Sequence, residues 1–407
     1  MGSLMPDIGG EEAEEGKVAA LVVGAGPAGL AAAEVLAEAG VSVVVADAMP
    51  SVGRKFLMAG KSGLNLTKDE DLTAFLTRYG DGNAAFRDAV SQFGPKDVAA
   101  WASGLGEGVF TGSTGRVFPN AMKASPLLRR WMARLGERGV EVQTRWRWVG
   151  WRDDSFLFET KDGLRSIHAD VAVIALGGGS WARLGSDGAW LTVFESEGIA
   201  CTPFQASNAG LRVDWSDHMN RHFGVPVKGT ALKAGDAVTR GEWIVGTRGL
   251  EGGGVYEVTR AVREGGQLFV DLMPDVSLEE LSARLSASRG KMSLSNWLRK
   301  VGRLSDIQRA LLMEWGRPLP NGSELAETIK TLPVPVVGLF PLDEAISTAG
   351  GVAWEALEGF MLKSRPGTLV AGEMLDWDAP TGGYLITGCL ATGRAAGEQA
   401  LDYLRLK

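Results

Sequence analysis

Residues 18–47 read VAALVVGAGPAGLAAAEVLAEAGVSVVVAD, and the fold is decided by this stretch. The apolar run 18–23 predicts a buried strand that ends in glycines. A stretch rich in alanine and leucine follows and predicts a helix. A second apolar strand over 41–46 ends at Asp47. This strand–turn–helix–strand order is typical of a nucleotide-binding unit with a parallel sheet.

The glycines at the first turn have the spacing G-x-G-x-x-G. Gly24 permits the tight turn, Gly26 lets a pyrophosphate approach the backbone, and Gly29 lets the helix pack closely on the strand. The free N–H groups and the dipole at the helix start favour phosphates. Asp47 lies 18 residues after Gly29, where a carboxylate accepts a ribose hydroxyl. The unit therefore predicts a bound dinucleotide; the alternative is an empty strand-to-helix turn.

The bulk properties predict an ordinary globular protein of two or three domains, because the chain has 407 residues, 45% of them hydrophobic and 22% charged. A net charge of −7 argues against nucleic acid as the main partner. Only Cys201 and Cys389 are present, which favours a reducing, cytoplasmic setting. His218 and His222 have helical spacing but no evident third ligand, so no metal site is predicted. No run of apolar residues is long enough to predict a membrane span.

Residues 48–72 form a Gly-rich segment that is too irregular for a long helix. It carries cationic and amide side chains, namely Arg54, Lys55, Lys61, Asn65 and Lys68. Such a loop can present N–H groups and cations to phosphates and to a flavin ring, and Lys61 and Asn65 are the candidates for the reacting edge. The alternative is a solvated basic loop. Residues 111–123 are expected to be a loop as well.

Composition changes near residue 202 and again near residue 277. Residues 202–275 have the pattern of short strands and turns, whereas 277–330 have helical periodicity and a capping box at Ser277 and Glu280. The predicted division is a disordered leader (1–16), a Rossmann-type nucleotide domain (17–201 and 340–407), an inserted β domain (202–276 and 331–339) and a helical subdomain (277–330).

The C-terminal part has the same order of strand, Gly-rich turn and helix as the opening motif. A predicted strand over 368–376 contains Gly372 and Glu373, and a Gly-rich turn at 379–388 leads into a final helix. Glu373 can hold a polyol hydroxyl. The helix start beside Gly383 and Tyr384 can stabilise negative charge on a reduced flavin.

Seven motifs together resemble the YhiN/BaiN-like flavoproteins, also called aminoacetone-oxidase-family FAD-binding enzymes. In chain order they are GAGPAG, Asp47, GRKFLMAGKSGLNLT, ALGGGSW, STAGGV, AGE and APTGGYLITGCLATGRAAG, and the resemblance covers 17–407. It implies an α/β, Rossmann-type flavoprotein fold of the two-dinucleotide-binding-domain type, with an inserted, mostly β domain and a small helical subdomain. The chain departs from the wider family at Gly63 and Leu64, where many members have Arg-Cys.

The resemblance implies one FAD. By position, the glycine turn binds the pyrophosphate, Asp47 the ribose, Gly372 and Glu373 the ribityl or pyrophosphate side, and 383–386 the isoalloxazine. The expected cofactor-binding residues are Gly24, Gly26, Pro27, Ala28, Gly29, Asp47, Ala48, Arg54, Lys55, Asn65, Gly177, Gly372, Glu373, Gly383, Tyr384, Leu385 and Ile386.

The expected function is an FAD-dependent oxidoreductase that acts on a small organic substrate. No second nucleotide fingerprint is readable, so NAD(P)H would visit transiently, or oxygen would reoxidise the flavin. Two alternatives stay open: a flavin- or NAD-binding enzyme that modifies a nucleotide or tRNA, and a non-enzymatic flavin-binding or redox-sensing protein. The acidic balance weakens the first alternative.

Overall fold

The computed structural model describes residues 14–61, 63–80 and 82–407. Within this part of the chain the contacts separate two compact units. Unit 1 comprises the described residues up to Gln205 together with Ser347–Lys407, and unit 2 comprises Ala206–Ile346. Each unit buries a hydrophobic cluster of its own. The finer division of unit 2 into a β domain and a helical subdomain stays a prediction.

The central sheet of unit 1 is parallel where the nucleotide-binding motif predicts it. Its neighbouring strands run in the order β23-β9-β1-β2-β6. Val22 of β1 lies opposite Val45 of β2 on one side and Val173 of β9 on the other. The bounds are β1 Glu14–Val23, β2 Val43–Asp47, β6 Glu141–Thr144, β9 Gly163–Ile174 and β23 Thr368–Val370. This is the predicted Rossmann-type arrangement.

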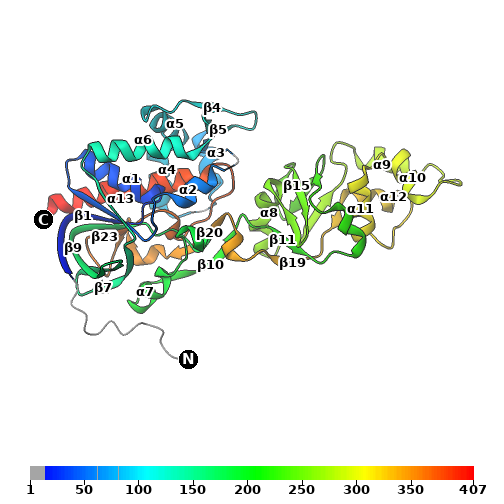
Figure 1. Cartoon of the computed structure of the whole chain (residues 1–407). Coiled ribbons are helices and arrows are strands. Elements are labelled where there is room, and N and C mark those ends of the chain that lie inside the picture. Colours follow the sequence, from blue (N-terminus) through cyan, green and yellow to red (C-terminus); the bar gives the residue numbers. More distant parts are fainter. Residues whose placement is uncertain (1–13, 62, 81) are drawn as a thin grey trace. The chain divides into compact units, whose positions relative to one another are not determined.

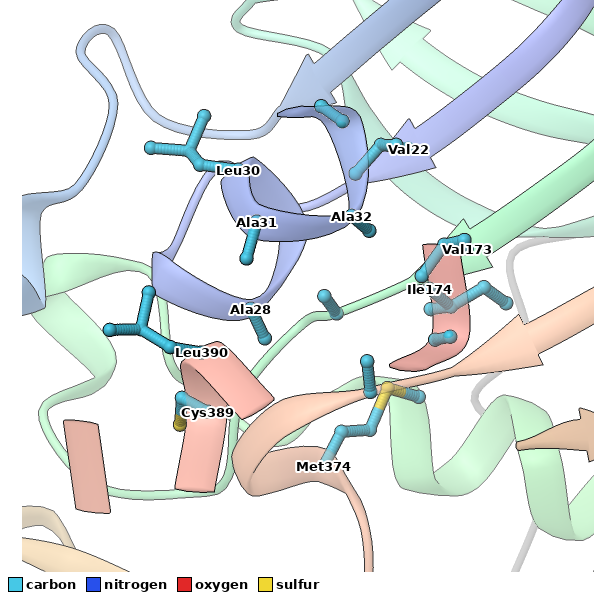
Figure 2. Packing of buried hydrophobic residues seen from close by; sticks show 14 of the residues in the cluster. Val22, Ala28, Leu30, Ala31, Ala32, Val173, Ile174, Met374, Cys389 and Leu390 are labelled. Atoms are coloured by element: carbon cyan, nitrogen blue, oxygen red, sulfur yellow. The ribbon is translucent and has the colours of Figure 1, made fainter. Parts of the chain in front are cut away.

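Helices α1 (Pro27–Glu38) and α13 (Tyr384–Leu406) pack against each other and against this sheet. Small residues allow the close approach: a Cβ on Gly393 of α13 would lie 2.2 Å from the carbonyl oxygen of Ala28. Figure 2 shows side chains from both helices and from the ends of β1 and β9 in one buried cluster. The last helix of the chain thus returns to the first nucleotide-binding turn (Figure 1).

The other elements of unit 1 are helices and further strands. The helices are α2 Arg54–Ala59, α3 Leu72–Thr77, α4 Ala84–Gln92, α5 Pro95–Gly104, α6 Ala124–Glu137 and α7 Trp190–Ser196. The strands are β3 Thr67–Lys68, β4 Val109–Thr111, β5 Arg116–Pro119, β7 Arg147–Arg152, β8 Ser155–Thr160, β10 Cys201–Ser207, β20 Ser347–Val352, β21 Leu357–Glu358 and β22 Met361–Leu362. Of these strands, β7, β8, β21 and β22 extend the central sheet, whereas β3, β5 and β4 form a second sheet and β10 and β20 a third.

Unit 2 combines small antiparallel sheets with helices. Its strands are β11 Leu211–Val213, β12 Pro226–Val227, β13 Ala231–Ala234, β14 Ala237–Thr239, β15 Trp243–Gly246, β16 Gly249–Glu251, β17 Leu268–Asp271, β18 Leu332–Pro333 and β19 Val336–Leu339. Its helices are α8 Gly253–Arg263, α9 Leu278–Leu285, α10 Leu294–Lys300, α11 Asp306–Trp315 and α12 Gly322–Lys330. Ser277 caps α9 by accepting from the N–H of Glu280, at the predicted helix start.

Several local predictions were wrong. Of the predicted leader, residues 1–13 lie outside the described part, but Glu14–Gly16 extend β1 and pair with β9. The predicted loop 111–123 contains β5, which pairs with β4. The segment 48–72 contains the short helix α2. Helix α8 interrupts the β region predicted over 202–275 and begins within the glycine run 252–254. The strand predicted over 368–376 stops at Val370, because Gly372 turns the chain with φ +80°.

We find no helix among the described residues with the length and apolar character that a bilayer crossing requires.

Candidate functional site

The glycine turn has the geometry that its spacing predicts. Gly24 has φ +104°, and a Cβ there would lie 2.3 Å from the carbonyl oxygen of Ala175. A Cβ on Gly29 would lie 1.9 Å from the carbonyl oxygen of Gly24, so this glycine lets α1 pack on the turn. A Cβ on Gly26, in contrast, would meet no atom within 4 Å. Gly26 is also the N-cap of α1 and supplies no side-chain hydrogen bond. The helix start is therefore free to receive an anion.

Asp47 ends β2 beside this turn, and backbone amides hold its carboxylate. It accepts from the N–H of Ala25 and from the N–H of Met49, both at 2.8 Å. Burial raises the pKa of Asp47 above its usual value, against the lowering effect of these two hydrogen bonds and of the positive charge of Arg54. The carboxylate is thus fixed in orientation at the end of the strand.

One cavity in unit 1 brings these groups together with segments from the middle and the end of the chain. Its lining contains most of the predicted cofactor-binding residues, namely Gly24, Gly26, Pro27, Ala28, Asp47, Ala48, Arg54, Lys55, Gly177, Gly372 and Glu373. Residues that the sequence did not assign also line it, among them Met49, Ser51, Ser186 and Cys389. Gly29 lies behind the turn, where it is buried.

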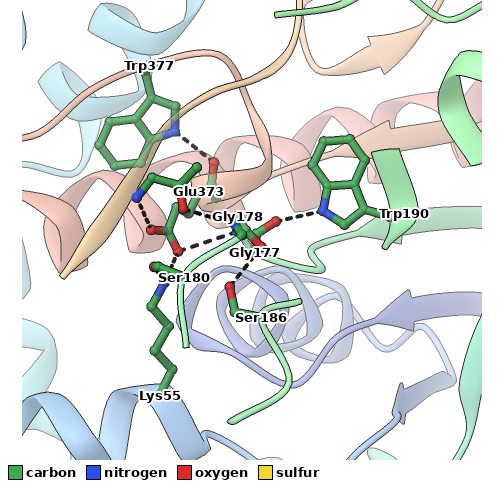
Figure 3. Close-up of polar contacts among 11 residues, drawn as sticks. Lys55, Gly177, Gly178, Ser180, Ser186, Trp190, Glu373 and Trp377 are labelled. Atoms are coloured by element: carbon green, nitrogen blue, oxygen red, sulfur yellow. Dashed lines mark hydrogen bonds and ion pairs between the residues drawn. The ribbon is translucent and has the colours of Figure 1, made fainter. Parts of the chain in front are cut away.

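A buried ion pair crosses this cavity (Figure 3). The Nζ of Lys55 on α2 lies 2.6 Å from Oε2 of Glu373 and 2.7 Å from Oγ of Ser180. The other carboxylate oxygen of Glu373 accepts from the N–H of Thr348 at 2.9 Å. The side chain of Glu373 is only 7% exposed. Four segments distant in sequence therefore meet at one carboxylate.

Indole and hydroxyl groups fix the glycine segments around this pair. Trp190 donates to the carbonyl of Gly177, and Trp377 donates to the carbonyl of Gly372. Ser186 donates to the carbonyl of Gly178 at 2.9 Å. The sequence analysis assigned no role to Ser180 or Thr348, although both lie in motifs of the resemblance, ALGGGSW and STAGGV. Their place in these motifs could have identified both residues from the sequence.

The later part of the predicted flavin loop, around Lys61 and Asn65, lies outside the lining of this cavity, as does the C-terminal turn. These two segments contact each other. Gly383 has φ +95°, and a Cβ there would lie 2.5 Å from the backbone of Thr67, two residues after Asn65. Lys61 is exposed, whereas the Oδ1 of Asn65 is buried and has no hydrogen-bond partner among the described residues. The Oγ1 of Thr381, two residues before Gly383, is likewise buried and unpaired within the described part of the chain.

The side chain of Tyr384 points into the protein. Its hydroxyl donates to Glu70, and its ring stacks on Phe75 with centroids 4.5 Å apart. Burial, followed by the negative charge of Glu70, raises the pKa of Tyr384 well above its usual value. Leu385 and Ile386, which follow in α13, are partly buried against the core of unit 1. Any contact of residues 383–386 with a flavin ring stays a prediction.

The cavity has the donor set that an FAD requires. It offers open backbone at Gly26, a carboxylate at Asp47 and cations at Arg54 and Lys55. The Nε of Arg54 is buried and, within the described residues, has no hydrogen-bond partner. Burying a guanidinium N–H without a hydrogen-bond acceptor costs free energy, which a bound anion would offset. The residues present therefore fit a bound dinucleotide with an anionic pyrophosphate.

Comparison with known proteins supports the same conclusion. Residues 18–399 match the sequence model of a family described as "HI0933-like protein Rossmann domain". The chain is 24% identical over 414 residues to a 3-dehydro-bile acid delta(4,6)-reductase of Clostridium scindens, with 94% of this chain and 98% of that protein covered. It is also 24% identical over 394 residues to a ribosomal RNA dihydrouridine synthase of Escherichia coli K12, with 90% and 93% covered.

Among solved structures, the 3-ketosteroid delta1-dehydrogenase of Sterolibacterium denitrificans has a similar fold. Its TM-score is 0.53 at 11% identity, and the match covers 96% of this chain and 100% of that one. At this identity the likeness concerns the fold alone.

Proposed function

Since the chain belongs to the HI0933-like family of Rossmann proteins, we propose that it is an FAD-dependent oxidoreductase that reduces a carbon–carbon double bond conjugated to a carbonyl group. The observation that carries the proposal is the single cavity in which the N-terminal glycine turn, Asp47 and the Lys55–Glu373 pair meet. The fold and the donor set support FAD as the cofactor.

Two relatives support the reaction class. One is named as a delta(4,6)-reductase of a 3-dehydro bile acid, whose double bonds are conjugated with a ketone. The other is named as a dihydrouridine synthase, and dihydrouridine is uridine whose C5=C6 bond, conjugated with the C4 carbonyl, has been reduced. Such a bond becomes single when a hydride adds to the carbon β to the carbonyl and a proton adds to the α carbon. We propose the same chemistry for this chain.

The residues of the cavity bind and orient in this proposal. Bound FAD supplies the two-electron hydride chemistry. The N-terminus of α1 binds the pyrophosphate, and Arg54 adds positive charge beside it. Asp47 accepts hydroxyls of the adenosine ribose. Glu373, held in place by Lys55 and the N–H of Thr348, accepts a hydroxyl of the ribityl chain. NAD(P)H is the proposed two-electron donor and binds transiently.

Stopped-flow spectroscopy under anaerobic conditions tests the reaction class. The protein is reduced with NADH or NADPH and then mixed with a cyclic enone or with the matching saturated ketone. We expect rapid reoxidation of the flavin by the enone and none by the ketone. A panel of enones and uracil derivatives is tested in the same way. If none of them reoxidises the flavin and only admitted oxygen does, the proposed function is refuted.

Lys61 and Asn65 remain the proposed residues beside the reacting edge. The Oδ1 of Asn65, which has no hydrogen-bond partner among the residues that the structure describes, supports a ligand contact there. We predict that Asn65→Ala and Lys61→Ala shift the flavin midpoint potential by tens of millivolts, since roughly 30 mV corresponds to 1.4 kcal/mol for a two-electron couple. Lys123→Ala, an exposed lysine that does not line the cavity, is the matched control. If both variants keep the parental potential and reduction rate, neither residue acts on the flavin.

A further inference from the structure

We propose that residues 281–305 of unit 2, here called the basic segment, form a docking surface for RNA. The whole chain has a net charge of −7, yet this stretch of 25 residues contains no aspartate or glutamate. It contains six basic side chains, namely Arg284, Arg289, Lys291, Arg299, Lys300 and Arg303. The average charge, which argues against a nucleic-acid partner, therefore conceals a strongly positive region.

Most of these cations are free to meet a partner. Arg289, Lys291, Arg299, Lys300 and Arg303 are exposed, and none of the five forms a salt bridge with an acidic side chain in the described part of the chain. Arg299 donates to the amide oxygen of Asn296, which leaves its charge uncompensated. Arg284 differs, because it pairs with Glu280. The surface thus presents five uncompensated positive charges.

The basic segment is a folded surface and not a loose tail. It runs from the last turns of α9 through α10 to the start of α11. Five of its apolar side chains are buried in the core of unit 2, namely Leu281, Leu285, Trp297, Leu298 and Leu304. Figure 1 shows α9 and α10 on the side of unit 2 that faces away from its strands. The backbone that carries the cations is therefore anchored to the core of the unit.

The side chains between the cations suit a phosphate backbone. The exposed polar residues there are Ser286, Ser288, Ser293, Ser295 and Asn296. Hydroxyl and amide groups of this kind share the phosphate contacts of arginine and lysine in nucleic-acid complexes. A bilayer surface instead needs apolar side chains that insert among the lipids, and none of the large exposed hydrophobic side chains of the described chain lies between 281 and 305. The chemistry therefore favours RNA over an anionic membrane.

This inference deepens the proposed function and rests on it in one respect. If the conjugated double bond that the enzyme reduces belongs to a base, the basic segment would hold the RNA that carries this base. RNA binding itself requires neither FAD reduction nor turnover. The two proposals can therefore fail separately.

Fluorescence anisotropy tests the docking surface. A labelled hairpin RNA of mixed sequence is titrated with the full-length FAD-loaded protein at several salt concentrations. The test variant changes Arg289, Lys291, Arg299, Lys300 and Arg303 to glutamine. The matched control changes five exposed basic residues of unit 1 to glutamine, namely Lys17, Lys96, Lys123, Arg129 and Lys161. Both variants alter the net charge equally.

We expect the parent and the control to bind the hairpin with similar affinity, and the test variant to bind at least tenfold more weakly. The slope of log affinity against log salt should fall in magnitude by about 3, because each phosphate contact contributes roughly 0.7 for single strands and 0.9 for duplexes and not every cation makes one. FAD content and melting temperature verify folding. If the test variant does not fold, the double charge reversal Arg289→Glu with Lys300→Glu replaces it.

Three results would overturn the inference: no RNA binding by the parent, equal weakening in test and control variants, or tighter binding to phosphatidylserine vesicles than to RNA. Enone reduction by the test variant is measured in parallel. Retained reduction with lost RNA binding supports both proposals. If the parent binds RNA but reduces no substrate, the proposed function is refuted and the docking surface is not.

Discussion

Asp47 illustrates how a single side chain is prepared for a ligand. Its carboxylate is oriented by the N–H groups of Ala25 and Met49 and lies in the lining of the cavity. We predict that Asp47→Ala weakens FAD binding by about 1–3 kcal/mol, the cost of a lost hydrogen bond to a charged group whose partner is left unpaired. Isothermal titration of the apoprotein with FAD measures this change. An unchanged affinity would remove Asp47 from the ribose site.

The two cysteines are predicted to be inert. Burial raises the pKa of Cys389, which lines the cavity, to about 12, and that of Cys201 to about 11. Since the thiolate is the reactive form, its fraction at pH 8 is on the order of 10⁻⁴ for Cys389 and 10⁻³ for Cys201. We expect almost no labelling by iodoacetamide at pH 8 and a rate that rises with pH. Urea-unfolded protein is the control, and rapid labelling of native Cys389 would contradict the prediction.

At the scale of the elements, the contact between α1 and α13 depends on glycine. A Cβ on Gly393 would lie within 2.2 Å of the Ala28 carbonyl, whereas one on Gly136 of α6 would meet nothing within 4 Å. We predict that Gly393→Ala destabilises the protein by about 1–3 kcal/mol through overpacking. Gly136→Ala, the matched control, should stabilise it by about 0.4–1 kcal/mol by restricting the unfolded chain. Urea unfolding measures both, and equal effects would show that the helices can separate at little cost.

At the scale of the whole molecule, the two units have separate cores. The buried cluster of unit 1 is drawn from residues 20–199 and 352–400, and that of unit 2 from residues 211–334. The FAD cavity is lined by unit 1 alone. We therefore predict two unfolding transitions in calorimetry, and we expect FAD to raise the midpoint temperature of only one of them.

The expected stabilisation is about 2.7 kcal/mol at a ligand concentration of 100 times the dissociation constant. Scanning calorimetry with and without FAD measures it, and AMP at the same concentration serves as the control. A single transition, shifted as a whole by FAD, would show that the units unfold together.

The sequence by itself determined the nucleotide-binding core. Gly24, Gly26, Gly29 and Asp47 act within one local unit of strand, turn, helix and strand, so their spacing along the chain fixes their spacing in space. The family and its FAD-binding Rossmann fold followed from the same motifs. The strands β4 and β5 were missed because such short elements carry too few residues for a periodic pattern. Helix α8 was missed because it begins at Gly253 and Gly254, and glycines of this kind are typical of turns.

Only the tertiary structure decided which distant groups meet. Glu373 pairs with Lys55, 318 positions earlier in the chain. The buried Glu34 of α1 accepts from the indoles of Trp101 and Trp131 and pairs with Arg134. Neither pairing follows from spacing, because a buried charge is stabilised by whatever partners the folded chain brings to it. Local motifs could therefore predict the cofactor, whereas these pairings between distant residues had to be found in the folded protein.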